Sequence, residues 1–211
     1  MIYFISDLHF GHQTIRNVER FEFETIEEHD KKLVEIINSV VKDTDTLYIL
    51  GDIGNIEPVR LINGRKILIK GNHDKMSRNK YLGYFAEVYD YPVYFNRRVL
   101  LSHEPHPVED HILNIHGHLH GSVLDSKNHL NLSAAMVDYK PMSENDIQKH
   151  IAELPKANRK FLQEWFADLY VFSDTKRFND DVIMDENNKV KLKETIEHRK
   201  TFFSQKEKNK E

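Results

Sequence analysis

Five short motifs between residues 7 and 120 combine the residue types that hold divalent metal ions in proteins. They are Asp7-Leu8-His9, Gly51-Asp52, Gly71-Asn72-His73-Asp74, Ser102-His103 and Gly117-His118-Leu119-His120. Their side chains supply carboxylate, imidazole and amide oxygen, which are ligands for ions of borderline hardness. The motifs offer more ligands than one tetrahedral ion can take, and they suit two ions that share a carboxylate.

The spacing within the motifs suggests that their side chains point the same way. Asp-x-His and His-x-His place two side chains on one side of the chain when the backbone is extended. Glycines precede Asp52, Asn72 and His118, where they permit tight turns and a close approach of the backbone. Each motif also follows a predicted strand, and strand ends can direct side chains into one crevice. We therefore expect the five motifs to form one site.

The segments around the motifs predict alternating strands and helices. Short apolar runs predict strands at 1–6, 46–50, 66–70, 92–95, 98–102, 111–115 and 130–137. A capping box of Thr25 and Glu28 predicts the start of a helix, and a shorter helix is expected at 56–63. This alternation indicates an α/β layered fold. The later strands have no helices between them, which indicates that part of the sheet is mixed or antiparallel.

A change in charge density near residue 142 suggests two parts. Charged residues make up 36 of the first 142 positions and 28 of the last 69. We expect a compact domain at 1–142 and a helical extension at 143–211. Helices are predicted after Ser143, at 157–172 and at 189–204. The aromatic stripe of the second one is expected to pack on the domain as a buttress, with a lid or a dimer face as alternatives.

The overall composition excludes several classes of protein. The 211-residue chain has no cysteine, so disulfides, thiolate metal sites, iron–sulfur clusters and a cysteine nucleophile are excluded. Its net charge of −4 creates no positive field that attracts nucleic acid or an anionic membrane. There is no basic segment typical of a signal peptide and no run of about 18 apolar residues. We expect a cytoplasmic protein with no membrane partner.

Histidine is unusually frequent and unevenly distributed. The chain has 13 histidines, and six of them lie between His103 and His120. Imidazole without thiolate indicates metal binding or acid–base chemistry. Outside the motifs, His29 is expected to be an ordinary surface residue, and His116 to be a core or supporting imidazole on the opposite strand face.

The complete set of five motifs, in this order, resembles the signature of the calcineurin-like metallophosphoesterases. Segments 7–12 and 139–143 are similar to a bacterial and phage branch of small phosphoesterases. The resemblance covers residues 1–145. It implies a two-layer β-sandwich flanked by helices, and a hydrolase of phosphoesters that depends on two divalent metal ions. Manganese is expected first, with iron, nickel, cobalt and zinc as alternatives.

The resemblance also implies a role for each motif residue. One ion would be held by Asp7, His9 and His120, the other by Asn72, His103 and His118, with Asp52 bridging them. A metal-bridging hydroxide would attack phosphorus, His73 would assist the leaving group, and Asp74 would orient His73. Many members of the family have aspartate where this chain has Asn55, so a supporting carboxylate is missing at that position.

The expected substrate is a small soluble phosphodiester or phosphomonoester, with nucleotides among the candidates. Two alternatives stay open, a nuclease that acts on single-stranded nucleic acid and a catalytically inactive scaffold that binds protein. The acidic balance disfavours the nuclease, and the complete motif set disfavours the scaffold. A homo-oligomer joined through the C-terminal helices is also compatible with the sequence.

Several residues near the motifs have two interpretations. His12 either touches the substrate phosphate or caps the next helix. Arg16 and Arg78 are candidates for substrate binding, because a guanidinium can hold phosphate through two donors. Taken singly, each of these arginines, like Arg20 and Lys75, is more often a solvated side chain.

Overall fold

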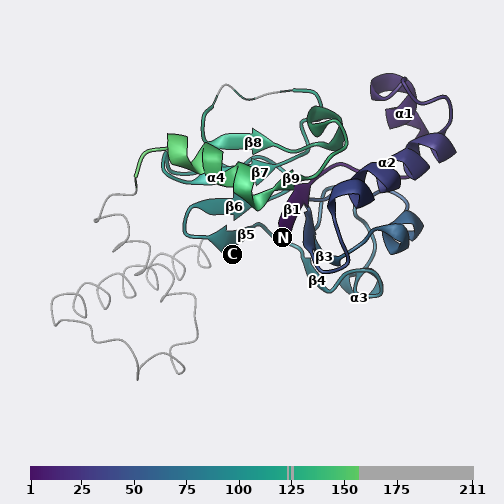
Figure 1. Ribbon diagram of the computed structural model, residues 1–211, viewed down its shortest axis with the longest axis horizontal. Coiled ribbons are helices and arrows are strands. Elements are labelled where there is room, and N and C mark those ends of the chain that lie inside the picture. Colours follow the sequence, from purple (N-terminus) through teal and green to yellow (C-terminus); the bar gives the residue numbers. More distant parts are fainter. Residues whose placement is uncertain (123, 125, 157–211) are drawn as a thin grey trace, which may run out of the picture. The chain divides into compact units, whose positions relative to one another are not determined.

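The computed structural model describes residues 1–122, 124 and 126–156. This part of the chain carries one five-stranded and one four-stranded β-sheet together with helices (Figure 1). The mixed α/β architecture expected from the motifs is confirmed. The helices expected at 157–172 and 189–204 lie outside the described residues, and their part as lid, buttress or dimer face stays a prediction.

The five-stranded sheet has the strand order β4-β3-β2-β1-β9. Its strands are β1 (Ile2–Ile5), β2 (Thr46–Ile49), β3 (Arg65–Ile69), β4 (Glu87–Tyr89) and β9 (Met142–Ser143). Strands β1 to β4 run parallel, and β9 pairs antiparallel with β1. Because parallel strands end at one edge, the residues that follow β1, β2 and β3 begin side by side.

The four-stranded sheet has the order β5-β6-β7-β8. Its strands are β5 (Val93–Asn96), β6 (Val99–Leu101), β7 (Leu113–His116) and β8 (His129–Asn131). The β5–β6 hairpin is antiparallel, and the other two pairs are parallel, so the expected mixed character is confirmed. The strand predicted at 130–137 was too long, because its second half forms a 3-10 helix. The short strands β4 and β9 gave no sequence pattern.

Helices pack around these sheets and cap them. They are α1 (Gln13–Glu19), α2 (Ile26–Val40), η1 (Glu57–Leu61), α3 (Arg78–Tyr81), η2 (Ala134–Val137) and α4 (Glu144–Glu153). Thr25 caps α2 as predicted, because its hydroxyl accepts the backbone N–H of Glu28 at 3.1 Å. The carboxylate of Glu28 reaches back to the N–H of Glu24. None of the helices in the described residues has the length and apolarity of a membrane span.

The side chains of β1 alternate between two hydrophobic clusters, as the pleat of a strand requires. Phe4 packs in the cluster that contains Leu113 of the second sheet. Ile5 packs in the cluster that contains Leu33 and Ile37 of α2. The first sheet is therefore covered by the second sheet on one face and by α2 on the other (Figure 1).

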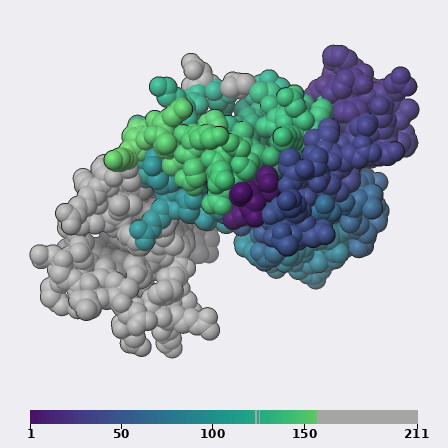
Figure 2. Space-filling view, viewed as in Figure 1, coloured from purple at the N-terminus to yellow at the C-terminus, as the bar shows by residue number. Residues whose placement is uncertain are grey.

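The compact unit extends beyond the boundary expected after residue 142 and ends at Pro155. Ile147 of α4 packs with the strands of both sheets in the second cluster. Ser143 pairs with β1 and also caps α4, which ties the helix to the sheet. In Figure 2 the first residues of the chain, in purple, lie between the segment of α4 in green and that of α2 in blue. The boundary after residue 142 was predicted from charge density, and the charged surface residues of α4 raised that density although one face of the helix is buried.

This packing predicts that α4 contributes to the stability of the domain. Ile147 is 2% exposed, so Ile147→Ala should lower the free energy of unfolding by about 2–4 kcal/mol through lost burial and a cavity. Glu153→Ala, at an exposed position of the same helix, should change it by less than about 0.5 kcal/mol. Urea unfolding followed by far-ultraviolet circular dichroism measures both, and equal effects would contradict the assignment of α4 to the core.

Candidate metal centre

The candidate centre forms where strands of both sheets end. Asp7, Asp52 and Asn72 follow β1, β2 and β3, and His103 and His118 follow β6 and β7. Backbone hydrogen bonds connect these ends, from Asp7 N–H to Gly51 O at 3.0 Å and from Gly117 N–H to His103 O at 2.9 Å. The two sheets thus bring motifs that are up to 113 positions apart into one place.

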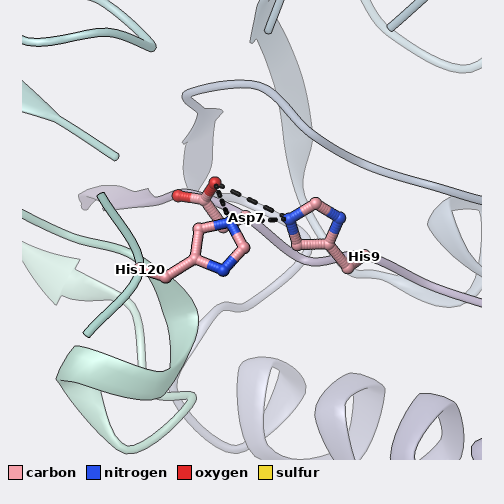
Figure 3. Close-up of side chains that lie close together, drawn as sticks. All are labelled: Asp7, His9 and His120. Atoms are coloured by element: carbon pink, nitrogen blue, oxygen red, sulfur yellow. Dashed lines mark hydrogen bonds and ion pairs between the residues drawn. The ribbon is translucent and has the colours of Figure 1, made fainter. Parts of the chain in front are cut away.

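One group of ligand atoms consists of Asp7, His9 and His120 (Figure 3). The Oδ1 atom of Asp7 lies 3.8 Å from Nε2 of His9 and 3.7 Å from Nε2 of His120, and these two nitrogens are 3.3 Å apart. Asp7 Oδ1 is buried and has no hydrogen-bond donor among the described residues. Its other oxygen accepts the N–H of His118 and the hydroxyl of Ser133. A buried carboxylate oxygen that faces two imidazole nitrogens fits a cation.

A second group consists of Asn72, His103 and His118. The Oδ1 atom of Asn72 lies 2.9 Å from Nε2 of His103 and 3.1 Å from Nδ1 of His118. The two imidazole nitrogens are 3.2 Å apart. An amide oxygen and two imidazoles converge here in the same way as the ligand atoms of the first group.

Asp52 lies between the two groups. Its Oδ2 atom is 3.4 Å from Nε2 of His103 and 3.8 Å from Nε2 of His9. Its Oδ1 atom accepts the backbone N–H of His73 at 2.9 Å. One carboxylate therefore faces histidines of both groups, which is the placement that a shared ligand requires.

Burial and charge shift the pKa of His9 and that of Asp52 toward the protonation states that metal ligands need. Burial lowers the pKa of His9 to about 3, so its imidazole is neutral at pH 7. Burial alone would raise the pKa of Asp52, but hydrogen bonding and positive charge from His103 outweigh it and lower that pKa to about 2. The site thus presents an ionised carboxylate beside a neutral imidazole.

Further hydrogen bonds set the orientation of two of the histidine rings. Nδ1 of His103 donates to the carbonyl of Leu50 at 2.8 Å, which makes Nε2 the nitrogen that would bind a metal ion. Nδ1 of His120 donates to the carboxylate of Glu19 at 2.5 Å, which has the same consequence. Carboxylate and carbonyl partners of this kind are usual behind metal-binding histidines. Glu19 was not found from the sequence, because nothing marks an exposed glutamate on a helix as a partner of a residue 101 positions away.

A buried arginine network holds the loop that carries Asp7. Arg20 is 1% exposed and donates to the carbonyls of Asp7 and Leu8 at 2.5 and 2.8 Å. It also donates to Nε2 of His29, whose Nδ1 donates to Asp30. The expectations of a solvated Arg20 and a surface His29 were therefore wrong, because His29 lies on the buried face of α2 and Arg20 is buried against it. His116, by contrast, is buried as expected and donates to Gly117 O.

The backbone conformation of the motifs corrects the idea of extended spacing. Asp7, His9, Asp52, His118 and His120 all have positive φ, between 47° and 66°. Residues other than glycine adopt this region rarely and at some cost, and such residues often cluster at functional sites. Left-handed residues follow β1, β2 and β7, so the side chains there converge through turns and not because these strands continue.

Two glycines are required because carboxylates lie against their backbone. A Cβ atom on Gly117 would lie 2.1 Å from Oδ2 of Asp7, and one on Gly71 would lie 2.3 Å from Oδ1 of Asp52. Any side chain at either position would displace a carboxylate of the site. The expected close approach is confirmed at these positions.

The structure gives Asp74 a different part from the expected one. Its carboxylate accepts the backbone N–H groups of Gly71, Asp52 and Ile53 at 2.8, 2.9 and 3.1 Å. In the described residues no hydrogen bond joins it to His73. Asp74 therefore ties the loops after β2 and β3 together, because its buried carboxylate takes the nearest free amides. The ring of His73 is exposed, 6.1 Å from that of His9.

The three candidates for substrate binding have protein partners. His12 caps α1, because its Nδ1 accepts the N–H of Ile15 at 3.3 Å, and its ring lies 5.3 Å from that of His9. Arg16 donates to the carbonyl of Glu24, and Arg78 to that of Val88. Both guanidinium groups hold neighbouring segments instead of lying among the metal ligands.

Comparison with known proteins identifies the family of the chain that carries this site. The model of the calcineurin-like phosphoesterases matches residues 1–192. The chain belongs to this family. Its members are metal-dependent phosphoesterases, and the Asp and His groups described above agree with the divalent ions that they bind. At the position of the missing supporting carboxylate, the side chain of Asn55 accepts the N–H of Glu57 instead.

Three proteins that are similar to this chain have names that state no substrate. An uncharacterized protein of Methanocaldococcus jannaschii is 34% identical over 170 residues, which is 71% of this chain and 90% of the relative. Gene 66 protein of Mycobacterium phage L5 is 34% identical over 167 residues, which is 59% of this chain and 80% of the relative. A protein of unknown function from Aquifex aeolicus, known from a crystal structure, is 33% identical in sequence and superposes with a TM-score of 0.58. The match covers 71% of this chain and 98% of the Aquifex chain.

The low pKa of His9 predicts how the stability of the metal-free protein depends on pH. Below pH 6.5 the unfolded chain protonates this histidine, whereas the folded chain does not until about pH 3. The free energy of unfolding should therefore fall as the pH is lowered through this window. His9→Gln removes this contribution, so the stability difference between wild type and variant should shrink toward pH 3. Urea unfolding of metal-stripped protein at several pH values measures it.

His150→Gln is the matched control, because His150 is a half-buried histidine on α4, away from the site. Its stability difference from the wild type should stay level over the same range. A constant difference for His9→Gln as well would contradict the assignment of a buried, neutral His9.

Proposed function

We propose that this protein is a two-metal-dependent hydrolase of phosphoesters, a phosphodiesterase or phosphatase that acts on a small soluble substrate such as a nucleotide. One observation carries the proposal, namely that Asp52 faces histidines of two separate ligand groups. Each group adds three ligands of its own, Asp7, His9 and His120 on one side and Asn72, His103 and His118 on the other.

The donor set fits two divalent ions. The unpartnered Oδ1 of Asp7 and the neutral Nε2 of His9 are buried groups whose lone pairs face each other. Such an arrangement costs free energy unless a cation lies between the groups. Divalent ions bound there would polarise a phosphoryl group and lower the pKa of water to about 7. Nitrogen and oxygen ligands do not choose among the divalent ions of this class. Manganese, the ion expected first, is therefore tested first, and iron, nickel, cobalt and zinc follow.

The residues of the chain then have separate roles in the reaction. The carboxylates and imidazoles would hold the ions that position the phosphoryl group, and a water oxygen, its proton released to solvent, forms the new bond to phosphorus as the bond to the leaving oxygen breaks. His73 stands at the exposed rim of the site, where it can give a proton to that leaving oxygen. Asp52 accepts the backbone N–H of His73 and thereby fixes the loop that carries this imidazole. Asp74 supports catalysis by holding the loops together.

A paired hydrolysis assay tests the proposal. Metal-stripped protein reloaded with Mn²⁺ should hydrolyse p-nitrophenyl phosphate or its bis-p-nitrophenyl diester. Asp52→Asn should lower kcat/KM at least about 100-fold, and His73→Ala should lower kcat by about 100-fold for alkyl leaving groups, which need a proton most. Asp43→Asn and His150→Ala, the same changes away from the site, should leave both rates within about twofold.

The outcomes separate the functions still open. Diester hydrolysis that disappears in Asp52→Asn supports the phosphodiesterase. A preference for single-stranded nucleic acid with steep salt dependence supports a nuclease. Silence on every substrate with metal bound contradicts an enzyme and favours a scaffold.

The hydrogen bond between His120 and Glu19 predicts that a change at Glu19 weakens metal binding at one of the two sites. Glu19→Gln should weaken binding at one of the two sites by about 10-fold or more, because the ring loses its charged hydrogen-bond partner. Titration of metal-stripped protein with Mn²⁺ by calorimetry measures both sites. Glu27→Gln, on the exposed first turn of α2, should bind both ions as the wild type does. Equal weakening at both sites would contradict a specific role for Glu19.

A further inference from the structure

Two clefts are lined in part by residues of the candidate site. One, of about 240 Å³, is lined by Asn72 and His103 of the centre together with Lys70, Asp90, Tyr91 and Glu104. The other, of about 650 Å³, is lined by His73 together with Asn55, Lys75, Ser77, Lys80 and Tyr81, and is called the lysine cleft below. Under the proposed function each cleft borders a group that acts on the substrate, Asn72 and His103 for the smaller cleft and His73 for the lysine cleft, so each can take one side of it.

The two clefts differ in charge. In the smaller one the only lysine, Lys70, forms an ion pair with Asp90 at 2.8 Å, and Glu104 adds a further negative charge. The lysine cleft is lined by two lysines and no carboxylate. Among the described residues neither Lys75 nor Lys80 forms an ion pair. Both ammonium groups can therefore take a ligand at no cost to an existing pair.

The carboxylates near the lysine cleft are already engaged. Glu57 accepts the hydroxyl of Tyr84 and pairs with Arg60 at 3.4 Å. Asp74 is 5% exposed and is occupied by three backbone amides. These two carboxylates therefore do not neutralise Lys75 and Lys80, and the positive charge of the lysine cleft is available to an anionic group of a ligand.

We propose that the lysine cleft binds an anionic group on the leaving group of the substrate, which carries that charge in addition to the scissile phosphoester. The inference rests on the proposed function, in which His73 protonates the leaving oxygen, and it follows from the position of His73 in the lining of this cleft. Lys75, Lys80 and the hydroxyl of Ser77 offer the donors that a phosphate, sulfate or carboxylate accepts. Ile56 and Met76 supply apolar contact for the carbon skeleton between the two anionic groups.

The proposal also gives the substrate a direction. A second anionic group would be repelled by Asp90 and Glu104 in the smaller cleft and attracted in the lysine cleft. A substrate with one charged and one neutral substituent on phosphorus should therefore lose the charged one. Phosphoesters of phosphorylated or carboxylated alcohols meet this description, and simple alkyl esters do not.

A matched pair of chromogenic diesters tests this directly. The first is methyl p-nitrophenyl phosphate, and the second carries a carboxylate on the ring, next to the nitro group. Both release a nitrophenol, and each kcat/KM is divided by the rate of spontaneous hydrolysis of the same ester, so that the remaining difference reports the charge that would enter the lysine cleft. The Mn²⁺-loaded wild type should show a kcat/KM about 10-fold higher for the carboxylated diester, and this preference should decline with added salt.

Paired variants tie the preference to the lysines. In Lys75→Gln/Lys80→Gln the ratio of the two kcat/KM values should fall to about one, and Lys75→Arg/Lys80→Arg should restore most of it. Lys31→Gln/Lys32→Gln makes the same change of charge on the exposed face of α2 and should keep the wild-type ratio. A wild-type ratio near one, or one that both glutamine pairs lower equally, would overturn the proposal while leaving the hydrolase intact.

A binding measurement separates this inference from the proposed function. Carboxylated p-nitrophenol, the product itself, is titrated into Mn²⁺-loaded protein, with p-nitrophenol as the uncharged-ring comparison. The wild type should bind the carboxylated phenol about 10-fold more tightly than Lys75→Gln/Lys80→Gln does, whether or not either diester is hydrolysed. Equal affinity in both proteins would overturn the lysine cleft, whereas absence of hydrolysis alone would count against the hydrolase.

Discussion

Parallel pairing of β1, β2 and β3 is the constraint on which the site depends. It places the carboxyl ends of three strands at one edge, so Asp7, Asp52 and Asn72 begin as neighbours before any side-chain interaction forms. The second sheet packs on the first through the cluster around Phe4, and its strands β6 and β7 end at the same place. A shift of either sheet would separate the two ligand groups and remove Asp52 from between them.

The turns beyond these strands are held by charged groups that do not themselves face the centre. Five ligand residues have positive φ, a conformation that persists only where neighbouring interactions determine it. Asp74 supplies such interactions for the loops after β2 and β3, and Arg20 supplies them for the loop after β1. Both side chains are buried, and each satisfies backbone groups that the tight turns leave unpaired. These hydrogen bonds thus offset both the strain of the turns and the cost of burying the two charges.

The charges of the site divide into an inner and an outer part. Inside, a neutral His9 stands beside an ionised Asp52, which is the combination that attracts cations and repels free anions. Outside, one cleft has a lysine–aspartate pair and a glutamate, and the other has two unpaired lysines. A phosphoester with unequal substituents would meet an unequal environment on its two sides. The asymmetry lies in exposed loops, where relatives of the family can differ without disturbing the sheets.

The sequence alone determined the α/β class, the strands that carry the motifs, the cap at Thr25 and the convergence of the five motifs, because apolar periodicity and strand-end residues are local patterns. It did not predict the left-handed turns, the burial of Arg20 and His29, or the hydrogen bonds of Asp74. It also gave no sign of Glu19 behind His120. These features depend on which segments meet in space, and a buried polar residue is recognised only by the partners that satisfy it. The division of the ligands into two groups was implied by the family resemblance, whereas tertiary structure alone decided which charges line each cleft.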